Sequence, residues 1–147
     1  MTVVDTSVFI DMLFRYDEKR YKLANRLFRL LQDVETTITE PEIFKVELIG
    51  QLVRRMNKNE AILLYEEIIE RIEVVKIESL KEIAFSIAFE TGCRAVDSFY
   101  VAVAKMKCLI LISNDKVQVE SAKKYGVEAY YLIEDFDRAV GRLKEIK

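Results

Sequence analysis

Five short apolar runs rich in β-branched residues recur along this chain, and stretches long enough for helices separate them. The runs cover residues 2–5, 36–38, 74–77, 109–112 and 129–132. Their length and composition are typical of buried strands. Strands that alternate with helices indicate a parallel sheet covered by helices. We therefore expect an α/β fold, a three-layer α/β/α sandwich around a mostly parallel sheet of about five short strands.

The composition indicates one domain that spans residues 1–147. A chain of 147 residues can bury one sizeable core, and this chain is 51% hydrophobic with a single Pro. It contains no repeat and no Gly/Ser/Pro-rich linker. The net charge of −2 does not by itself indicate a nucleic-acid partner. Because charge appears by Asp5 and no apolar stretch is long enough to span a membrane, we expect a cytoplasmic protein without a signal peptide.

Local signals predict where several helices begin and end. Thr39 and Glu42 form a capping-box pattern around Pro41, which predicts a helix that reaches about Met56. The remaining signals are a cap at Asn57 or Asn59, a second capping box at Ser79 and Glu82 with a stop at Gly92, a helix over 96–107, a stop at Gly126 and a last helix over 135–146.

The absence of His restricts the possible chemistry. The chain has no His, so neither a Ser-His-Asp nor a Cys-His nucleophile system can form. Cys93 and Cys108 lack the CxxC spacing of a zinc or redox pair. Any catalysis must therefore use carboxylates, Lys, Tyr, a cysteine, or a metal ion held by oxygen atoms.

Two carboxylates follow predicted strands directly. Asp5 ends the first run, before Thr6-Ser7, and Asp115 follows the fourth run after Ser113-Asn114. In parallel α/β sheets the functional crevice lies at the carboxyl ends of the strands, so both acids fall on that edge. Each also has a simpler interpretation. Asp-Thr-Ser is a common strand-to-helix turn in which the Thr-Ser pair can act as N-cap, and Ser-Asn-Asp can cap the next helix.

Two further carboxylates lie on predicted helices. Glu47 lies at the flank of an apolar helix face, where it could simply be a solvated residue that supports Arg54. Asp97 is surrounded by small and apolar residues, although it could be an acid in the first turn that interacts with the helix dipole. Each acid alone is a weak signal, and the order and spacing of the four together carry the weight.

Four segments resemble the motifs of PIN-domain ribonucleases, in the order of that family and over nearly the whole chain. They are residues 3–10 around Asp5, Glu47-Leu48, residues 94–98 around Asp97, and residues 111–115 ending at Asp115. The length is similar to that of the small VapC-type toxins of toxin–antitoxin pairs. Ser113 stands where the family more often has Thr. A further acid that many members carry is missing, because Lys116 and Val117 follow Asp115.

The resemblance implies an acidic pocket that binds Mg²⁺ or Mn²⁺ and cleaves single-stranded RNA. Clustered carboxylates repel one another and so take up protons or cations, and hard oxygen ligands suit Mg²⁺ or Mn²⁺. We expect Asp5, Asp97 and Asp115 to be metal ligands, and Glu47 to orient or deprotonate the attacking water. Thr6, Ser113 and Asn114 would support these carboxylates.

An acidic pocket needs basic groups nearby if it is to hold RNA. Arg94, one turn from Asp97, is the best candidate for contact with a phosphate or a carboxylate. Arg15, Lys19 and Arg20 follow the first motif and could track the backbone, although a solvated helix face explains them as well. By analogy, we also expect a small antitoxin partner and self-association into a homodimer.

Two other functions remain open from the sequence. One is a PIN-like fold without catalysis that binds RNA or protein; the presence of all four acids argues against it. The other is a receiver-like domain that accepts a phosphoryl group with Mg²⁺. That fold requires an acidic pair after the first strand, whereas Asp5 has no acidic neighbour.

Overall fold

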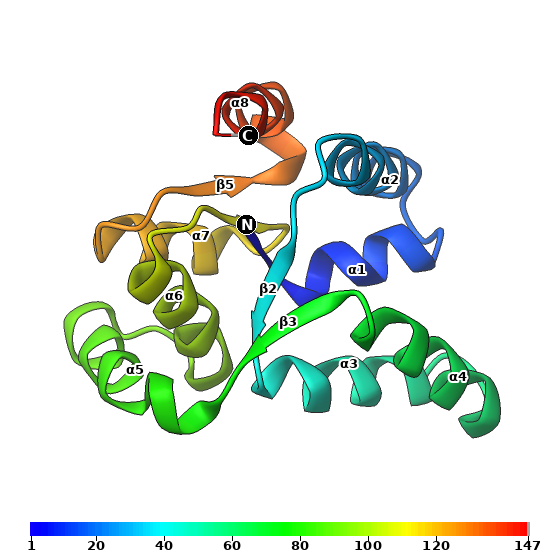
Figure 1. The fold of residues 1–147 in the computed structure, drawn as a ribbon, viewed down its shortest axis with the longest axis horizontal. Helices are drawn as coiled ribbons and strands as arrows, with labels where there is room; N and C mark the ends of the chain where they lie inside the picture. Colours follow the sequence, from blue (N-terminus) through cyan, green and yellow to red (C-terminus); the bar gives the residue numbers. More distant parts are fainter. Residues whose placement is uncertain (147) are drawn as a thin grey trace.

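A computed structural model describes residues 1–146 and contains a parallel sheet of five strands in two parts (Figure 1). Strands pair in the order β1-β4-β5 in one part and β2-β3 in the other, and every pairing is parallel. A single bridge between Thr2 and Ile38 joins β1 to β2. The predicted α/β sandwich with a parallel sheet is therefore confirmed. The strands are β1 (Val3–Val4), β2 (Ile38–Pro41), β3 (Ile72–Val75), β4 (Leu111–Ser113) and β5 (Ala129–Tyr131).

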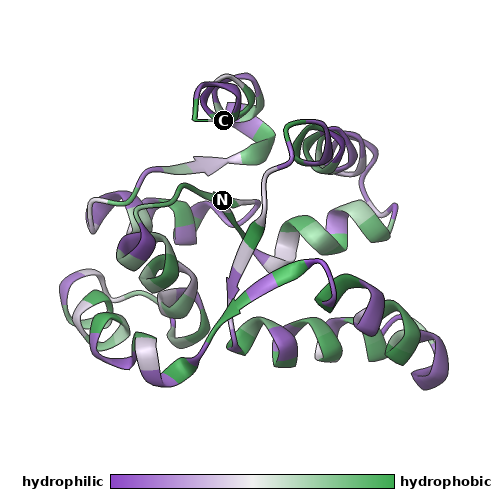
Figure 2. Ribbon diagram, in the orientation of Figure 1, coloured by the Kyte–Doolittle hydropathy of each residue, from purple (hydrophilic) through white to green (hydrophobic). Residues whose placement is uncertain are grey.

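Helices surround this sheet, with α5, α6 and α7 on the left of β2 and β3 in Figure 1 and α1 to α4 on the right. Hydrophobic residues occupy β1 and much of α3, α4 and α6 (Figure 2). The residues from Tyr100 to Ala104 in α6 are all buried, which makes this helix the centre of the core. The helices are α1 (Thr6–Leu13), α2 (Glu18–Asp33), α3 (Ile43–Val53), α4 (Lys58–Ile69), α5 (Ile77–Thr91), α6 (Ala95–Lys107), α7 (Lys116–Lys124) and α8 (Leu132–Glu145).

Both predicted capping boxes are wrong. Thr39 and Pro41 lie in β2, where Thr39 pairs with the backbone of Thr2, so α3 begins only at Ile43. The Glu42 side chain instead accepts a hydrogen bond from the backbone N–H of Ile77 at 3.1 Å, at the start of α5. Helix α5 begins at Ile77, which places Ser79 inside its first turn. Strand pairing outweighs the local capping pattern at Thr39, and at Ser79 the helix has already begun two residues earlier.

Other boundaries agree with the sequence. Asn57 caps α4 by accepting from the N–H of Glu60, and Gly92 ends α5 with a φ of 67°. Gly126, with a φ of 85°, follows α7. Helix α8 begins at Leu132, three residues before the predicted start, and its backbone breaks from helical geometry at Asp135. In residues 1–146, no helix combines the length and apolarity that a membrane span requires.

Candidate active site

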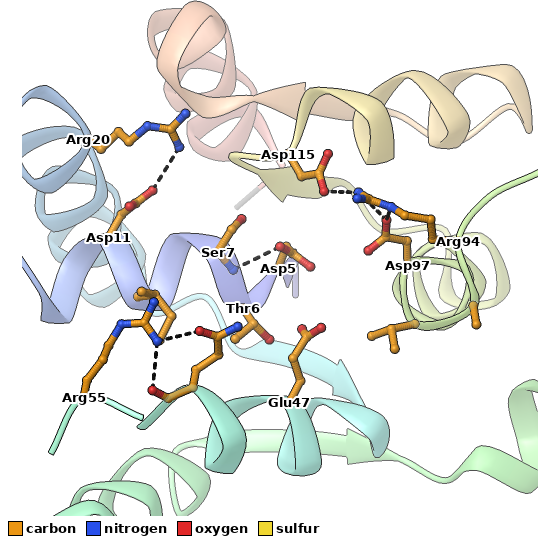
Figure 3. Close-up of a pocket in the computed structure, with 14 residues that line it drawn as sticks. Asp5, Thr6, Ser7, Asp11, Arg20, Glu47, Arg55, Arg94, Asp97 and Asp115 are labelled. Atoms are coloured by element: carbon orange, nitrogen blue, oxygen red, sulfur yellow. Dashed lines mark hydrogen bonds and ion pairs between the residues drawn. The ribbon is translucent and has the colours of Figure 1, made fainter. Parts of the chain in front are cut away.

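The four predicted acids line one pocket of about 560 Å³ (Figure 3). Strands β1 and β4 are neighbours with Val4 opposite Ile112, so Asp5 and Asp115 leave the sheet side by side at its carboxyl edge. Asp97 projects from the first turn of α6, and Glu47 from the middle of α3. Segments far apart in the sequence therefore bring four carboxylates to one cavity, as the motif order predicted.

Asp5 both begins helix α1 and faces the pocket. Its Oδ2 accepts from the N–H of Ser7 at 3.0 Å, so Asp5 itself is the N-cap and the predicted Thr-Ser cap is wrong. Its Oδ1 accepts from Nε2 of Gln118 at 3.0 Å. Burial raises the pKa of Asp5, against the opposing effect of the bonds to Ser7, and Glu47 raises it further. Ionisation of Asp5 is therefore unfavourable in this buried position, and a bound cation would offset that cost.

Arg94 joins the other two aspartates. Its guanidinium donates to Oδ2 of Asp97 at 2.8 Å and forms an ion pair with Oδ2 of Asp115. The other oxygen of Asp115 accepts from the N–H groups of Val117 and Gln118, so Asp115 caps α7 as well as facing the pocket. Burial and the charge of Asp5 raise the pKa of Asp97 to about 6, although Arg94 opposes this shift. The cationic side chain of Arg94 is 61% exposed and lies where the two carboxylates meet.

Glu47 is held by a buried tyrosine that the sequence did not reveal. The Tyr100 hydroxyl donates to Oε1 of Glu47 at 2.7 Å and lies 2.6 Å from Oγ1 of Thr6. Burial raises the pKa of Tyr100 far above its ordinary value, so its hydroxyl stays protonated. Arg54 does not form the ion pair with Glu47 that the simpler interpretation required, because its side chain donates to the Gly50 carbonyl.

The three predicted supporting residues lie at the site, and none of them donates directly to the four carboxylates. Thr6 contacts Tyr100, as above. The Ser113 hydroxyl accepts from the N–H of Asp115 at 2.9 Å and so fixes its backbone. Asn114 donates through Nδ2 to Asp11 at 2.7 Å, and its own N–H donates to the Ser7 hydroxyl. They therefore stabilise the loops that carry the acids.

Basic groups line part of the pocket. Of the predicted RNA-binding residues, Arg94 and Arg20 line it, with Arg20 paired to Asp11 at 3.4 Å. Arg15 pairs with Glu18 on the surface, and Lys19 lines other hollows beside α2. Arg55, which follows α3, was missed by the sequence reasoning and also lines the pocket (Figure 3).

A fifth acid, Glu40, lies fully buried in β2, close enough to Asp5 and Glu47 to interact with their charges. Its Oε1 accepts from the N–H of Val4 at 3.0 Å, while its Oε2 has no partner within residues 1–146. The Glu40 carboxylate thus accepts from β1 directly beyond the backbone bond of Thr39 to Thr2. Burial raises the pKa of Glu40 well above its ordinary value. In the sequence Glu40 precedes Pro41 at a predicted helix start, and this pattern does not indicate a buried acid beside Asp5 and Glu47.

The donor set of the pocket fits a hard divalent cation. Carboxylate oxygens are the ligands that Mg²⁺ and Mn²⁺ prefer, and burial, with a smaller effect of neighbouring acids, raises the pKa values of Asp5 and Asp97, which a bound cation would lower. Across the part of the chain that the structure describes, no three acids form a ready-made ligand cluster. Arg94 lies between two of the aspartates, so binding of an ion by both requires this side chain to move aside.

The fold and the pocket define an α/β protein with an acidic site at the carboxyl edge of a parallel sheet. The PIN domain family matches residues 2–124, and the chain belongs to this family. Members are typically nucleases that use divalent metal ions. The receiver-like alternative is therefore wrong.

Solved structures show the same fold. FitAcB from Neisseria gonorrhoeae superposes with a TM-score of 0.63 at 19% identity, over 88% of this chain and 96% of that chain. PAE2754 from Pyrobaculum aerophilum gives 0.65 at 16% identity, over 98% and 89%. FitAB bound to an IR36 DNA fragment gives 0.63 at 18% identity, over 88% and 94%. Among curated proteins, no relative matches the sequence significantly.

Proposed function

We propose that this protein is a metal-dependent endoribonuclease that cleaves single-stranded RNA. The observation that carries the proposal is the meeting of Asp5, Glu47, Asp97 and Asp115, from four separate segments, in one pocket with arginines at its edge. Membership of the PIN family supports a nuclease. RNA as the substrate follows the resemblance of these motifs to PIN ribonucleases.

Each side chain has a distinct part in the proposed reaction. Asp5, Asp97 and Asp115 would hold Mg²⁺ or Mn²⁺, which supplies a lowered pKa for water and a counter-charge for phosphate oxygens. Glu47 would orient or deprotonate the attacking water, and Tyr100 fixes the carboxylate that does so. Once it leaves the aspartates, Arg94 would bind a substrate phosphate, with Arg20 and Arg55 placed to neutralise the flanking backbone.

The test is cleavage of a mixed RNA pool with Mn²⁺ by wild type, Asp5→Asn and Asp97→Asn. Asparagine can still cap helix α1, so Asp5→Asn removes the charge and keeps the bond to the N–H of Ser7. We expect wild type to cleave, EDTA to stop it, and both variants to lose at least 100-fold in rate, about 2.7 kcal/mol. Asp135→Asn, in helix α8 outside the pocket, is the matched control. Equal cleavage by wild type and both variants would refute the proposal.

We further propose that the protein is the toxin of a toxin–antitoxin pair and forms a homodimer. Large apolar side chains on three helices are exposed and suit protein contacts: Val46, Ile49 and Val53 on α3, Ile62 and Leu63 on α4, and Phe85 and Phe89 on α5. Phe89 is 91% exposed. Sedimentation of wild type and Phe89→Ser tests the dimer, which the variant should weaken. A monomeric wild type would contradict it.

A further inference from the structure

One buried side chain contacts two of the acids at once. Gln118, in the first turn of α7, has no exposed surface. Its Nε2 donates to Oδ1 of Asp5 at 3.0 Å and lies 3.4 Å from Oδ1 of Asp97. A primary amide nitrogen carries two protons, so one can serve each carboxylate. No sequence motif singled out this residue.

The other end of the same amide has no partner. Oε1 of Gln118 is buried and accepts no hydrogen bond within residues 1–146. A buried carbonyl without a partner destabilises the folded protein, and an apolar side chain of similar volume would avoid that cost. The hydrogen bonds that Nε2 donates must therefore explain why a glutamine occupies this position.

The remaining contacts of the two aspartates show what the nitrogen adds. Oδ2 of Asp5 is fixed by the N–H of Ser7, and Oδ2 of Asp97 by Arg94. The Oδ2 atom of each carboxylate is thus already bonded, and both Oδ1 atoms contact Nε2 of Gln118, which carries no charge. Without this nitrogen, repulsion between the two buried carboxylates would turn them away from each other.

We propose that Gln118 is a positioning residue that keeps Asp5 and Asp97 at the spacing needed to share one divalent ion. The inference rests on the proposed metal-dependent function. Arg94 is exposed and cationic, so it competes with a metal and can swing into solvent. Gln118 is neutral and fully buried, so it stays in place and supports the same two carboxylates when the ion enters.

The experiment compares wild type with Gln118→Met, which has similar volume and no N–H donor. Free Mn²⁺ is measured by electron paramagnetic resonance during a titration, and the melting temperature is measured in EDTA. Loss of an outer hydrogen bond to a metal ligand typically weakens metal binding 10- to 100-fold, so we expect a Kd for Mn²⁺ at least about tenfold higher. The melting temperature in EDTA should change little, because loss of the bonds to Asp5 and Asp97 destabilises the fold while removal of the unpaired carbonyl stabilises it.

Two further variants separate positioning from packing. Gln118→Asn keeps the amide but is one methylene shorter, so it should reach one aspartate and raise the Kd by less than Gln118→Met. Gln32→Met, an exposed position on α2, should leave the Kd unchanged. An unchanged Kd in Gln118→Met, or an equal rise of the Kd in Gln118→Met and Gln118→Asn, overturns the positioning role alone. A wild type that binds no Mn²⁺ overturns both this role and the proposed function.

Discussion

The hydroxyl of Tyr100 lies between Thr6 and Glu47, 2.6 Å from the Thr6 hydroxyl and 2.7 Å from Oε1 of Glu47. Because Tyr100 has a single proton and a carboxylate can only accept, Tyr100 donates to Glu47 and Thr6 donates to Tyr100. Thr6, from the first motif, therefore acts on an acid of the second motif through a core residue of α6.

Replacing Tyr100 by Phe should impair catalysis more than folding. The change leaves Glu47 without its donor and Thr6 without its acceptor, so we expect about a tenfold lower cleavage rate at saturating Mn²⁺. The free energy of unfolding in urea should fall by about 1 kcal/mol. Tyr130→Phe is the control, because its hydroxyl bonds to Glu128 at 2.6 Å outside the pocket. A Tyr100→Phe variant as active as wild type would contradict the role given to Glu47.

Removing the charge of Arg94 should tighten metal binding. Arg94 neutralises Asp97 and Asp115, and Arg94→Gln removes a cation that competes with the metal for both. Exposed ion pairs contribute up to about 1 kcal/mol, so the Kd for Mn²⁺ should fall by as much as about fivefold. A titration of free Mn²⁺ measures this. Arg138→Gln breaks the pair with Asp135 instead and should have no effect. Weaker Mn²⁺ binding in Arg94→Gln would mean that Arg94 supports the ion.

Metal affinity should depend on pH through Asp97. Its pKa is raised to about 6, so below that pH a proton must leave before the carboxylate can bind an ion. The apparent affinity for Mn²⁺ should therefore rise with pH up to about 6, by as much as tenfold per unit, and then flatten. Titrations between pH 5 and pH 8 follow this change. In Asp97→Asn the rise should be shallower, and an affinity independent of pH in wild type would rule out Asp97 as a ligand.

The stability of the metal-free protein should decrease as pH rises. Burial raises the pKa of Glu40 in the folded state well above the ordinary value of 4.5 around which it ionises in the unfolded state. The folded state then binds more protons, so the free energy of unfolding falls as pH rises above 4.5. Glu40→Gln, which is always neutral, should flatten this slope in urea titrations with EDTA. Asp5 and Asp97, whose pKa values are also raised, account for the slope that remains.

The matched control for this experiment is Glu73→Gln in β3, whose side chain is 46% exposed. It should retain the full pH dependence of wild type. If Glu40→Gln and wild type show the same slope, Glu40 is ionised in the folded protein.

The sequence predicted the sheet and the edge position of Asp5 and Asp115 from local features, and it added Glu47 and Asp97 only through the order and spacing of the motifs. Short apolar runs mark buried strands, and acids directly after Val4 or near Ser113 must lie at the carboxyl edge of a parallel sheet. The contact of Arg94 with carboxylates followed from its spacing to Asp97 in a helix. These inferences need no knowledge of which distant segments meet.

Gln118, Glu40 and Tyr100 could not be assigned in this way. Each acquires its role from a partner at least 21 residues away, such as Asp97 for Gln118 or Glu47 for Tyr100. The false capping box at Thr39 has the same origin, because pairing with Thr2 and β3 outweighs the local pattern. Tertiary contacts determine which side chains are buried, and burial determines which polar side chains contribute to the site.

The two parts of the sheet meet at Thr2, which is fully buried and bonds to Thr37 and Thr39 on one side and to Ile110 on the other. Asp5 and Asp115 leave from one part, while Glu47 follows β2 in the other. A slip of one residue at this junction would displace Glu47 from Asp5 by about 3.3 Å, as far as a hydrogen bond reaches. The alignment of the pocket thus depends on a threonine that does not line it.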